Sequence, residues 1–282
     1  MKQVTFELFR YQLLPITRHV QQDLFKKIRT VEDIEKNKNS FFNEIMKEFP
    51  KLRHRLFELN HKELFCTNDI CCLKLGAHKT IERDNENFRK ERIENWPNVT
   101  IIINNDPQKQ LIAISRNSRA FSSCAVVADI VKHAFNSKLK SYQVKMHIEP
   151  LFDKKDFWKY VEKFENKLTS VRFELISPNM ANISNTLTVN LKQLNKETNS
   201  HRTNVEVNSP DGTALEIEKD NEMVNGLVEY ASKGGGDISI KVRGIRKRTH
   251  TSSAVKTVEV DEMTVDNLSY EQLVAFTDIL NQ

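Results

Sequence analysis

Glycine and proline are scarce in this chain, with seven of each among 282 residues, and long apolar runs are missing as well. This scarcity, together with 29% charged residues, excludes collagen-like and low-complexity chains and indicates a protein that folds nearly throughout. No segment approaches the roughly 18 uncharged apolar residues that cross a bilayer, so we expect no membrane contact. Glu7, Arg10 and Gln12 interrupt the N-terminal apolar run, which argues against a secretory signal and predicts a cytoplasmic protein.

Cysteine is also sparse, with Cys66, Cys71, Cys72 and Cys124 the four examples. A chain of this size does not need disulfide cross-links, and a reducing compartment predicts free thiols. The first three cysteines lie near histidines but lack the C-x2-C spacing that lets two thiolates bind one metal from a tight turn. We therefore expect neither a metal site nor a cofactor.

The chain is long enough for two domains, and 39% hydrophobic residues suffice for two cores. We expect an α+β protein divided within residues 136–140 into an N-terminal domain, 1–139, and a C-terminal domain, 140–282. The first domain opens with a strand that Pro15 ends. A helix with apolar residues at helical spacing up to Phe49 follows, and then an antiparallel meander. The meander strands are expected at 56–59, 70–75, 99–103 and 111–114.

A second helix closes the N-terminal domain. Apolar residues repeat at helical spacing between Ala125 and Phe135, which predicts a helix that buries one face. Ser122 or Ser123 can accept the first free N–H groups of this helix as an N-cap.

The C-terminal domain is predicted to alternate strands and helices in the order β-α-β, an inserted helix, and β-α-β. This is the order of a ferredoxin-like unit, with helices on one face of an antiparallel sheet. We expect it to be extended by a β-hairpin and a C-terminal helix that a capping box starts. In chain order the predicted segments are a strand at 142–149, a helix at 153–168, a strand at 171–176, a helix at 183–194, a strand at 205–207, a helix at 223–231, a strand at 238–242, a return strand at 255–260 and a helix from 269.

The basicity of the chain is concentrated in residues 233–256. This segment holds seven Lys and Arg residues against Asp237 alone, a net charge of +6, while the whole chain is only +5. Alternation over 238–242 turns every second side chain away from the core, and Gly244 allows a bulge beyond it. Lysine and arginine on phosphates release condensed counterions, so the segment predicts a nucleic-acid interface. Its candidate residues are Lys233, Lys241, Arg243, Arg246, Lys247, Arg248 and His250, joined by Lys192, Lys196 and Arg202 if the inserted helix packs nearby.

The simplest alternative is that these charges only protect an edge strand from pairing with another chain. One or two charges achieve that, whereas six net charges repel each other, so we favour polyanion binding. The sequence lacks a helix-turn-helix, a zinc finger and a stacking platform for single strands. We therefore expect sequence-tolerant binding dominated by phosphate contacts, with duplex DNA favoured.

Two other classes of function stay open. A metal-dependent nuclease or toxin needs converging carboxylates, and Glu149, Glu174 and Asp237 lie on or beside predicted strands. Their spacing is scattered, so solvated acids are the favoured interpretation and we lean towards a protein without catalysis. An adaptor whose hairpin binds an acidic protein is the third class.

The glycines 234–236 follow a helix, whereas a phosphate loop precedes one, so they predict helix termination.

The segment 147–184, HIEPLFDKKDFWKYVEKFENKLTSVRFELISPNMANIS, resembles a group of bacterial proteins found with mobile elements and phage-defence loci. Its I-E-P turn, made by Ile148, Glu149 and Pro150, and its V-x-F-E strand also distantly resemble the RexA phage-exclusion family and the KwaB family of Kiwa defence. The resemblance implies DNA binding without a catalytic site, as a dimer or with a partner protein. It points to a sensor or effector in phage defence.

Overall fold

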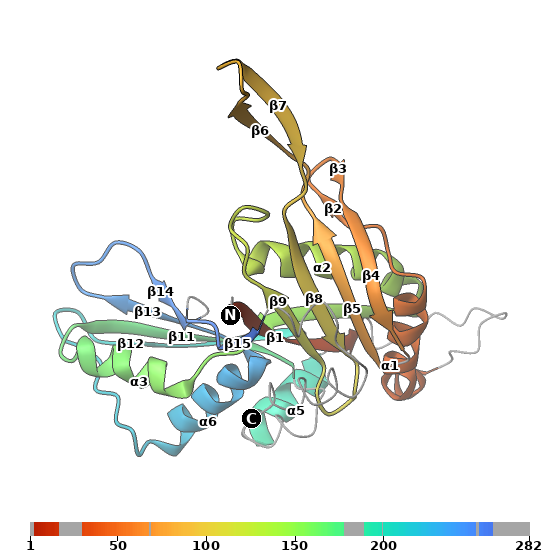
Figure 1. Cartoon of the computed structure of the whole chain (residues 1–282). Coiled ribbons are helices and arrows are strands. Elements are labelled where there is room, and N and C mark those ends of the chain that lie inside the picture. The colour runs from red at the N-terminus through yellow and green to blue at the C-terminus, as the bar shows by residue number, and fades with distance from the viewer. Residues whose placement is uncertain are drawn as a thin grey trace.

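The computed structural model describes residues 3–16, 30–67, 69–177, 189–198, 200–251 and 254–261. It is an α+β protein built mostly of antiparallel strands, as the sequence predicts, with a seven-stranded sheet and a four-stranded sheet as its main parts (Figure 1). Among the helices in these ranges, none is both long and apolar enough to cross a membrane.

Strand β1 (Gln3–Pro15) organises the seven-stranded sheet. One edge of β1 pairs with β9. Its other edge is shared, because β15 pairs with residues 3–7 and β10 with residues 9–15. The sheet order is β10-β1-β9-β8-β5-β4. The bounds are β4 (Asn60–Cys66), β5 (Ile70–Gly76), β8 (Asn98–Asn104), β9 (Leu111–Ser115), β10 (Val144–Pro150) and β15 (Thr257–Asp261).

Helices α1 (Val31–Lys47) and α2 (Cys124–Leu139) cover one face of this sheet. Phe42 of α1 stacks between Tyr11 and Phe135, with ring centroids 5.0 and 4.7 Å away. The Ser123 side chain accepts the N–H of Val126, which confirms the predicted N-cap of α2. The 3-10 helix η1 (Lys140–Tyr142) follows α2.

The second sheet has the order β12-β11-β13-β14 and packs its apolar face against α3 and α6. Phe173 and Ile240 are both 1% exposed on this face, as the predicted alternation requires. Asp153, where the predicted helix at 153–168 begins, is the N-cap of α3. The bounds are α3 (Lys154–Lys163), β11 (Leu168–Ile176), α5 (Val189–Thr198), β12 (Arg202–Asn208), α6 (Glu222–Tyr230), the π-helical turn η2 (Ala231–Gly235), β13 (Gly236–Val242) and β14 (Thr249–His250).

Two strand partners differ from the prediction. The first strand of the expected ferredoxin-like unit, β10, pairs with β1 in the other sheet. The expected return strand, β15, also pairs with β1, while β13 pairs with the two-residue β14. Alternation identifies a strand and its buried face but does not say which sheet it joins. The helix expected from residue 269 lies outside the described residues.

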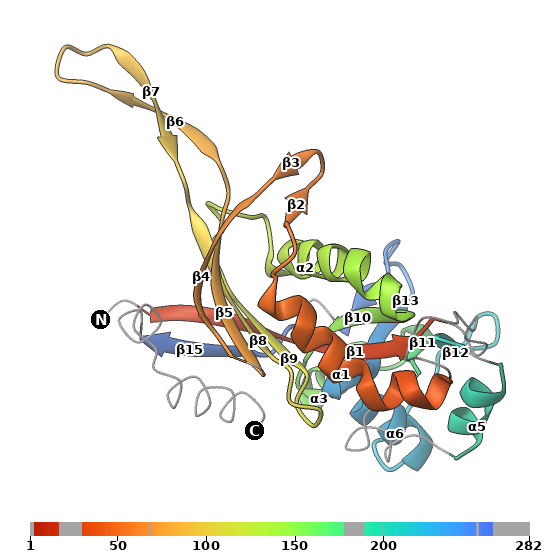
Figure 2. The same ribbon diagram turned by 90° about the vertical axis from the view of Figure 1, so that its right-hand side faces the viewer.

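A two-stranded ribbon of β6 (Lys79–Asp84) and β7 (Lys90–Asn95) projects far from both sheets (Figures 1 and 2). A smaller hairpin of β2 (Arg53–His54) and β3 (Phe57–Glu58) lies at the same end of the molecule. The sequence predicts no strands at 79–95. The two ribbon strands contain only two apolar side chains, Ile81 and Ile93, so they show no apolar alternation.

Candidate nucleic-acid interface and carboxylate cluster

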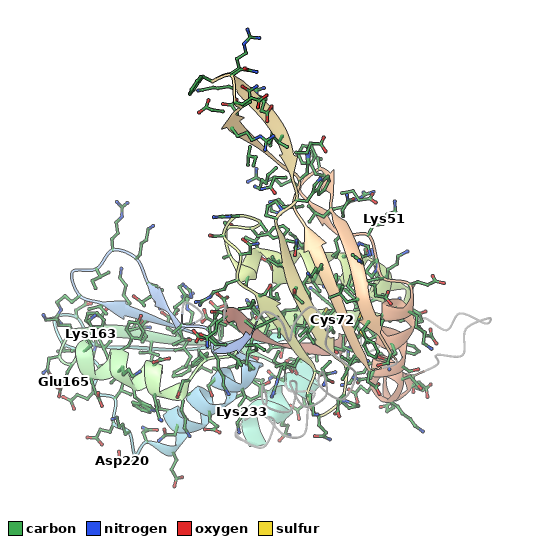
Figure 3. The ribbon with its side chains drawn as sticks, in the orientation of Figure 1. Lys51, Cys72, Lys163, Glu165, Asp220 and Lys233 are labelled. Atoms are coloured by element: carbon green, nitrogen blue, oxygen red, sulfur yellow. The ribbon has the colours of Figure 1, made fainter. Side chains whose placement is uncertain are left out.

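The predicted cations do not form one patch. Lys233 precedes β13 and Arg243 follows it, and a seven-residue strand separates its ends by roughly 20 Å. Figure 3 accordingly shows Lys233 between the two sheets, whereas Lys163 and Glu165 mark the far end of the second sheet. The candidates divide between these two ends.

Lys233 and His250, at the end nearer the first sheet, are paired with acids. Lys233 Nζ lies 2.7 Å from Glu229, and His250 Nδ1 lies 2.6 Å from Asp237. Hydrogen bonds from Lys233 and Lys154 lower the pKa of the Glu229 carboxyl. These residues do not project as unneutralised charges, which corrects the expectation from the sequence.

Arg248 also has an acidic partner. Its Nη2 donates to Glu206 Oε1 at 2.6 Å and to Ser170 Oγ at 3.1 Å. Arg172 donates to the other oxygen of the same carboxylate, and hydrogen bonds from Arg172, Ser170 and Arg248 lower the pKa of Glu206 to about 2. Arg248 therefore lies on the polar face of the second sheet. The sequence gives no sign that Glu206 is a partner of Arg248, because 42 residues separate the two.

Four cations remain at the far end of the second sheet, on residues 241–247, which we call the basic loop. Gly244 adopts φ +83 there, so the chain turns where a side chain would be strained. In the part of the chain that the structure describes, no carboxylate lies within ion-pair distance of these cations. They are Lys241, Arg243, Arg246 and Lys247.

Two of these cations hold the basic loop in shape through backbone carbonyls. Arg243 Nη2 donates to the carbonyl oxygen of Thr213. Lys241 Nζ donates to the carbonyl oxygens of Ile245 at 2.8 Å and Arg246 at 2.6 Å. A carbonyl satisfies a donor but carries no net charge, so the loop is ordered while its positive charge is retained.

Lys167 is a neighbour of the basic loop that the sequence did not indicate. Its carbonyl oxygen accepts the N–H of Arg243 at 2.8 Å, and its side chain is exposed. The signal was weak because Lys167 lies in a different segment, beside Glu165. Among the other candidates, the side chains of Lys192 and Lys196 lie outside the described residues.

Three carboxylates that look scattered in the sequence converge between the two sheets. Glu174 and Asp237 are direct cross-strand partners in β11 and β13. Arg202 of β12 bridges Glu174 and Glu149, with Nη1 3.2 Å from Glu174 and Nη2 3.0 Å from Glu149. The strand registers thus correct the expectation of isolated, solvated acids.

Burial dominates the electrostatics of this carboxylate cluster. It raises the pKa of Glu149 to about 7, with Asp237 and Glu174 adding to the rise and Arg202 opposing it. Arg10 faces Glu149 across the β1–β10 register, and burial lowers the pKa of Arg10 to about 10. The positive charge among these carboxylates is the guanidinium of Arg202. In the described ranges, no three metal-ligating side chains are grouped to hold a metal ion.

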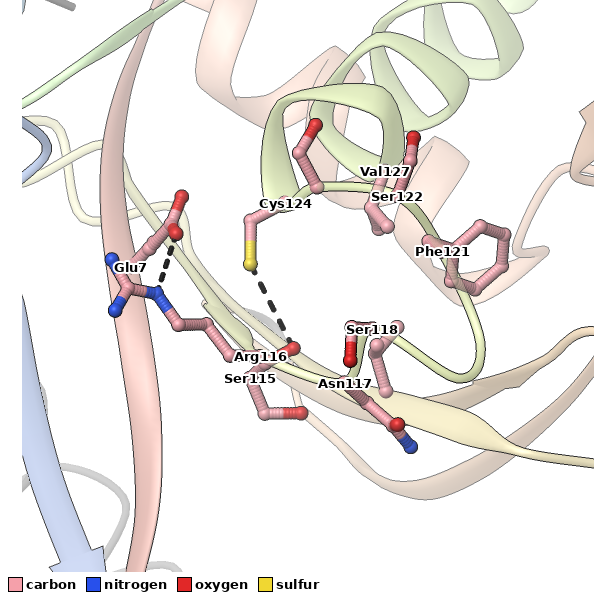
Figure 4. Close-up of a pocket in the computed structure, with 11 residues that line it drawn as sticks. Glu7, Ser115, Arg116, Asn117, Ser118, Phe121, Ser122, Cys124 and Val127 are labelled. Carbon is pink, nitrogen blue, oxygen red and sulfur yellow. Dashed lines mark hydrogen bonds and ion pairs between the residues drawn. The ribbon is translucent and has the colours of Figure 1, made fainter. Parts of the chain in front are cut away.

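A pocket beside the start of α2 contains a cysteine (Figure 4). The Cys124 thiol donates to the carbonyl oxygens of Ile114 and Ser115, and Glu7 pairs with Arg116 at 2.7 Å. Burial and the charge of Glu7 raise the pKa of Cys124 to about 12. The group is a thiol at neutral pH, so this pocket does not present an activated nucleophile.

Comparison of the chain with family models, with curated proteins and with solved structures found no match.

Proposed function

We propose that the protein binds nucleic acid, with duplex DNA as the favoured ligand, through the basic loop. One observation carries the proposal. Four cations lie within seven residues at an exposed end of the second sheet, without a carboxylate partner in the described ranges. Such a cluster releases counterions when it meets phosphates, which favours binding.

The shape of the basic loop supports binding without base specificity. It is a turn between β13 and the two-residue β14, so it offers no helix that fits the major groove. Phosphate contacts position a protein on DNA but carry no sequence information. The resemblance of residues 147–184 adds the proposal that this binding serves a non-catalytic sensor or effector in phage defence, in the cytoplasm and with a partner protein.

The test is a double substitution, Arg246→Gln with Lys247→Gln. The slope of log affinity against log salt should fall by about 0.9 for each phosphate that the variant no longer neutralises, hence by about 1.8 when both cations are removed. Affinity should weaken similarly for different duplex sequences. Fluorescence anisotropy with labelled duplexes over a range of salt concentrations measures both effects.

Two controls separate binding from general damage. Lys36→Gln with Lys47→Gln removes two exposed cations of α1, far along the chain, and should leave the slope unchanged. Arg248→Gln removes a cation that is paired with Glu206, so it should lower stability more than affinity. A wild-type affinity that does not respond to salt would contradict the proposal. Magnesium-dependent cleavage that Glu149→Gln abolishes would replace it with a nuclease.

A further inference from the structure

Cys66 and Cys71 lie directly opposite each other across the β4–β5 strand pair. Such partners point to the same face of a sheet, and both of these side chains pack in the core that α1 and α2 cover. Cys72, the next residue, points to the opposite face and is buried in a different core cluster. Cys124 begins α2 and donates to carbonyl oxygens of β9. The strand register therefore sets Cys66 and Cys71 apart as a pair.

The position of this pair in the ladder suits a disulfide. Thr67 donates its N–H to the carbonyl oxygen of Ile70 at 2.8 Å, which makes these two neighbours a hydrogen-bonded pair. Hydrogen-bonded and non-hydrogen-bonded pairs alternate along an antiparallel ladder, so Cys66 and Cys71 form a non-hydrogen-bonded pair with Cα atoms about 4.5 Å apart. A disulfide spans Cα separations of about 4.4–6.8 Å. The bond therefore fits without a change in the strand pairing.

The surroundings of the two thiols make them unequal. A hydrogen bond from Cys71 lowers the pKa of Cys66, and burial and the charge of Glu63 oppose this change. The same hydrogen bond and burial raise the pKa of Cys71. Cys66 is half-buried, whereas Cys71 is 0% exposed. Because the thiolate is the nucleophile and the oxidant must reach it, Cys66 is the thiol that reacts first.

A bond between these sulfurs has a structural consequence, because β4 is an edge strand. In the described residues β4 pairs only with β5, at the edge of the first sheet (Figure 1). Its first four residues are exposed, and the ladder is irregular between Glu63 and Phe65. Strands with few buried contacts open locally most readily. A covalent link at Cys66 fastens the end of β4 that lies against the carbonyl oxygen of Met46 in α1, 3.7 Å from the sulfur.

We propose that Cys66 and Cys71 are a redox-sensitive dithiol, which a peroxide converts into a reversible disulfide that fastens β4 to β5. The Cys66 thiolate attacks one peroxide oxygen, so that an S–O bond forms, the O–O bond breaks and hydroxide leaves. The Cys71 sulfur then attacks the Cys66 sulfur, the S–S bond forms and the S–O bond breaks. The two thiols lose two electrons and two protons, and the peroxide becomes two molecules of water. A dithiol reductant restores both thiols by exchange.

Peptide mapping of the full chain after treatment with hydrogen peroxide tests the bond. A protease that cuts before aspartate cleaves at Asp69, so Cys66 and Cys71 fall on different peptides that only the disulfide joins. The link should form in the wild type, disappear on reduction, and be absent from Cys66→Ala and Cys71→Ala. It should persist in Cys72→Ala, the matched control, because Cys72 is buried beside Cys71 but points to the other face.

Two further measurements test the order of reaction and its effect. In Cys71→Ala the oxidation of Cys66 should stop at the sulfenic acid, which dimedone traps, whereas Cys66→Ala should give no adduct at the buried Cys71. Hydrogen exchange of the β4 amides should slow severalfold in the oxidised wild type and recover on reduction. A wild-type chain without the Cys66–Cys71 link, a link that joins two molecules, or equal exchange in the oxidised and reduced protein would overturn the proposal.

Discussion

Arg246 and Arg248 are two residues apart, and their surroundings give them different roles. Arg246 is exposed on the basic loop, while the side chain of Arg248 is 27% exposed and pairs with Glu206 on the sheet. The same contrast holds among the acids. Three hydrogen-bond donors lower the pKa of Glu206 to about 2 and so favour its ionised form. Burial raises the pKa of Glu149 to about 7 and so favours its protonated form. Surroundings, rather than residue type, determine the charge that each side chain presents.

Glu149→Gln should change how stability depends on pH. The pKa of Glu149 rises from 4.5 to about 7 on folding. Its contribution to the free energy of unfolding is therefore fully present below pH 4.5 and is lost as pH rises towards 7. Arg10, Lys132, Glu174, Arg202 and Asp237 are the charged groups that face it. From about pH 5 to about pH 8 the variant should gain on the order of 2–3 kcal/mol relative to the wild type. Urea unfolding at both values measures this difference.

Glu206→Gln provides a control of opposite sign. The lowered pKa of Glu206 gives stability that is present above its unfolded pKa, 4.5, and lost only as pH falls towards 2. Between about pH 5 and about pH 8 the difference between this variant and the wild type should therefore stay nearly constant. An equal pH response in the two variants would contradict the assignment of the raised pKa to Glu149.

At the scale of elements, the glycines between α6 and β13 let the chain turn and pack closely against its neighbours. Gly234 adopts φ +81 at the end of η2, which confirms the predicted helix termination. At Gly236 the backbone passes so close to β11 that a Cβ atom would lie 1.9 Å from the carbonyl oxygen of Glu174. This close approach brings Asp237 and Glu174 together in the carboxylate cluster.

Gly236→Ala should destabilise the protein by at least about 2 kcal/mol, because β11 and β13 must separate to admit the methyl group. Gly212→Ala is the matched control. Gly212 also has a positive φ, +79, but a Cβ there meets nothing within 4 Å. Its cost should be only the backbone strain, about 1 kcal/mol. Equal losses in urea unfolding would show that strain, and not the close approach, decides both.

At the scale of the whole molecule, β1 ties the two halves of the chain together. The edge of β1 opposite β9 pairs with β10 and β15, two segments that the sequence places in the second domain. The buried Met146 of β10 packs in the same core as Phe135 of α2. The expected division at 139/140 therefore falls just ahead of a strand of the first sheet.

A fragment of residues 1–139 should fail to form the native first sheet, because it leaves the second edge of β1 and the α2 core uncovered. A fragment of residues 1–152 includes β10 and should recover more native structure. Near-ultraviolet circular dichroism and the cooperativity of urea unfolding compare the two. Cooperative unfolding of the shorter fragment, equal to that of the longer one, would contradict this prediction.

The sequence predicted the elements whose own residues carry the signal. Strands β1, β5, β8 and β9 and the N-caps Ser123 and Asp153 follow from apolar period and capping chemistry, which act over a few residues. The ribbon was missed because a solvated strand pair has no apolar face to display in its sequence.

Tertiary structure alone decided which distant residues meet. Arg10 lies opposite Glu149, and Arg248 lies against Glu206, across separations that no local pattern records. Composition established that residues 233–256 are basic. Only the strand registers decided which of those charges are paired with acids and which remain on the basic loop, because a carboxylate compensates a cation by its distance in space and not by its position in the chain.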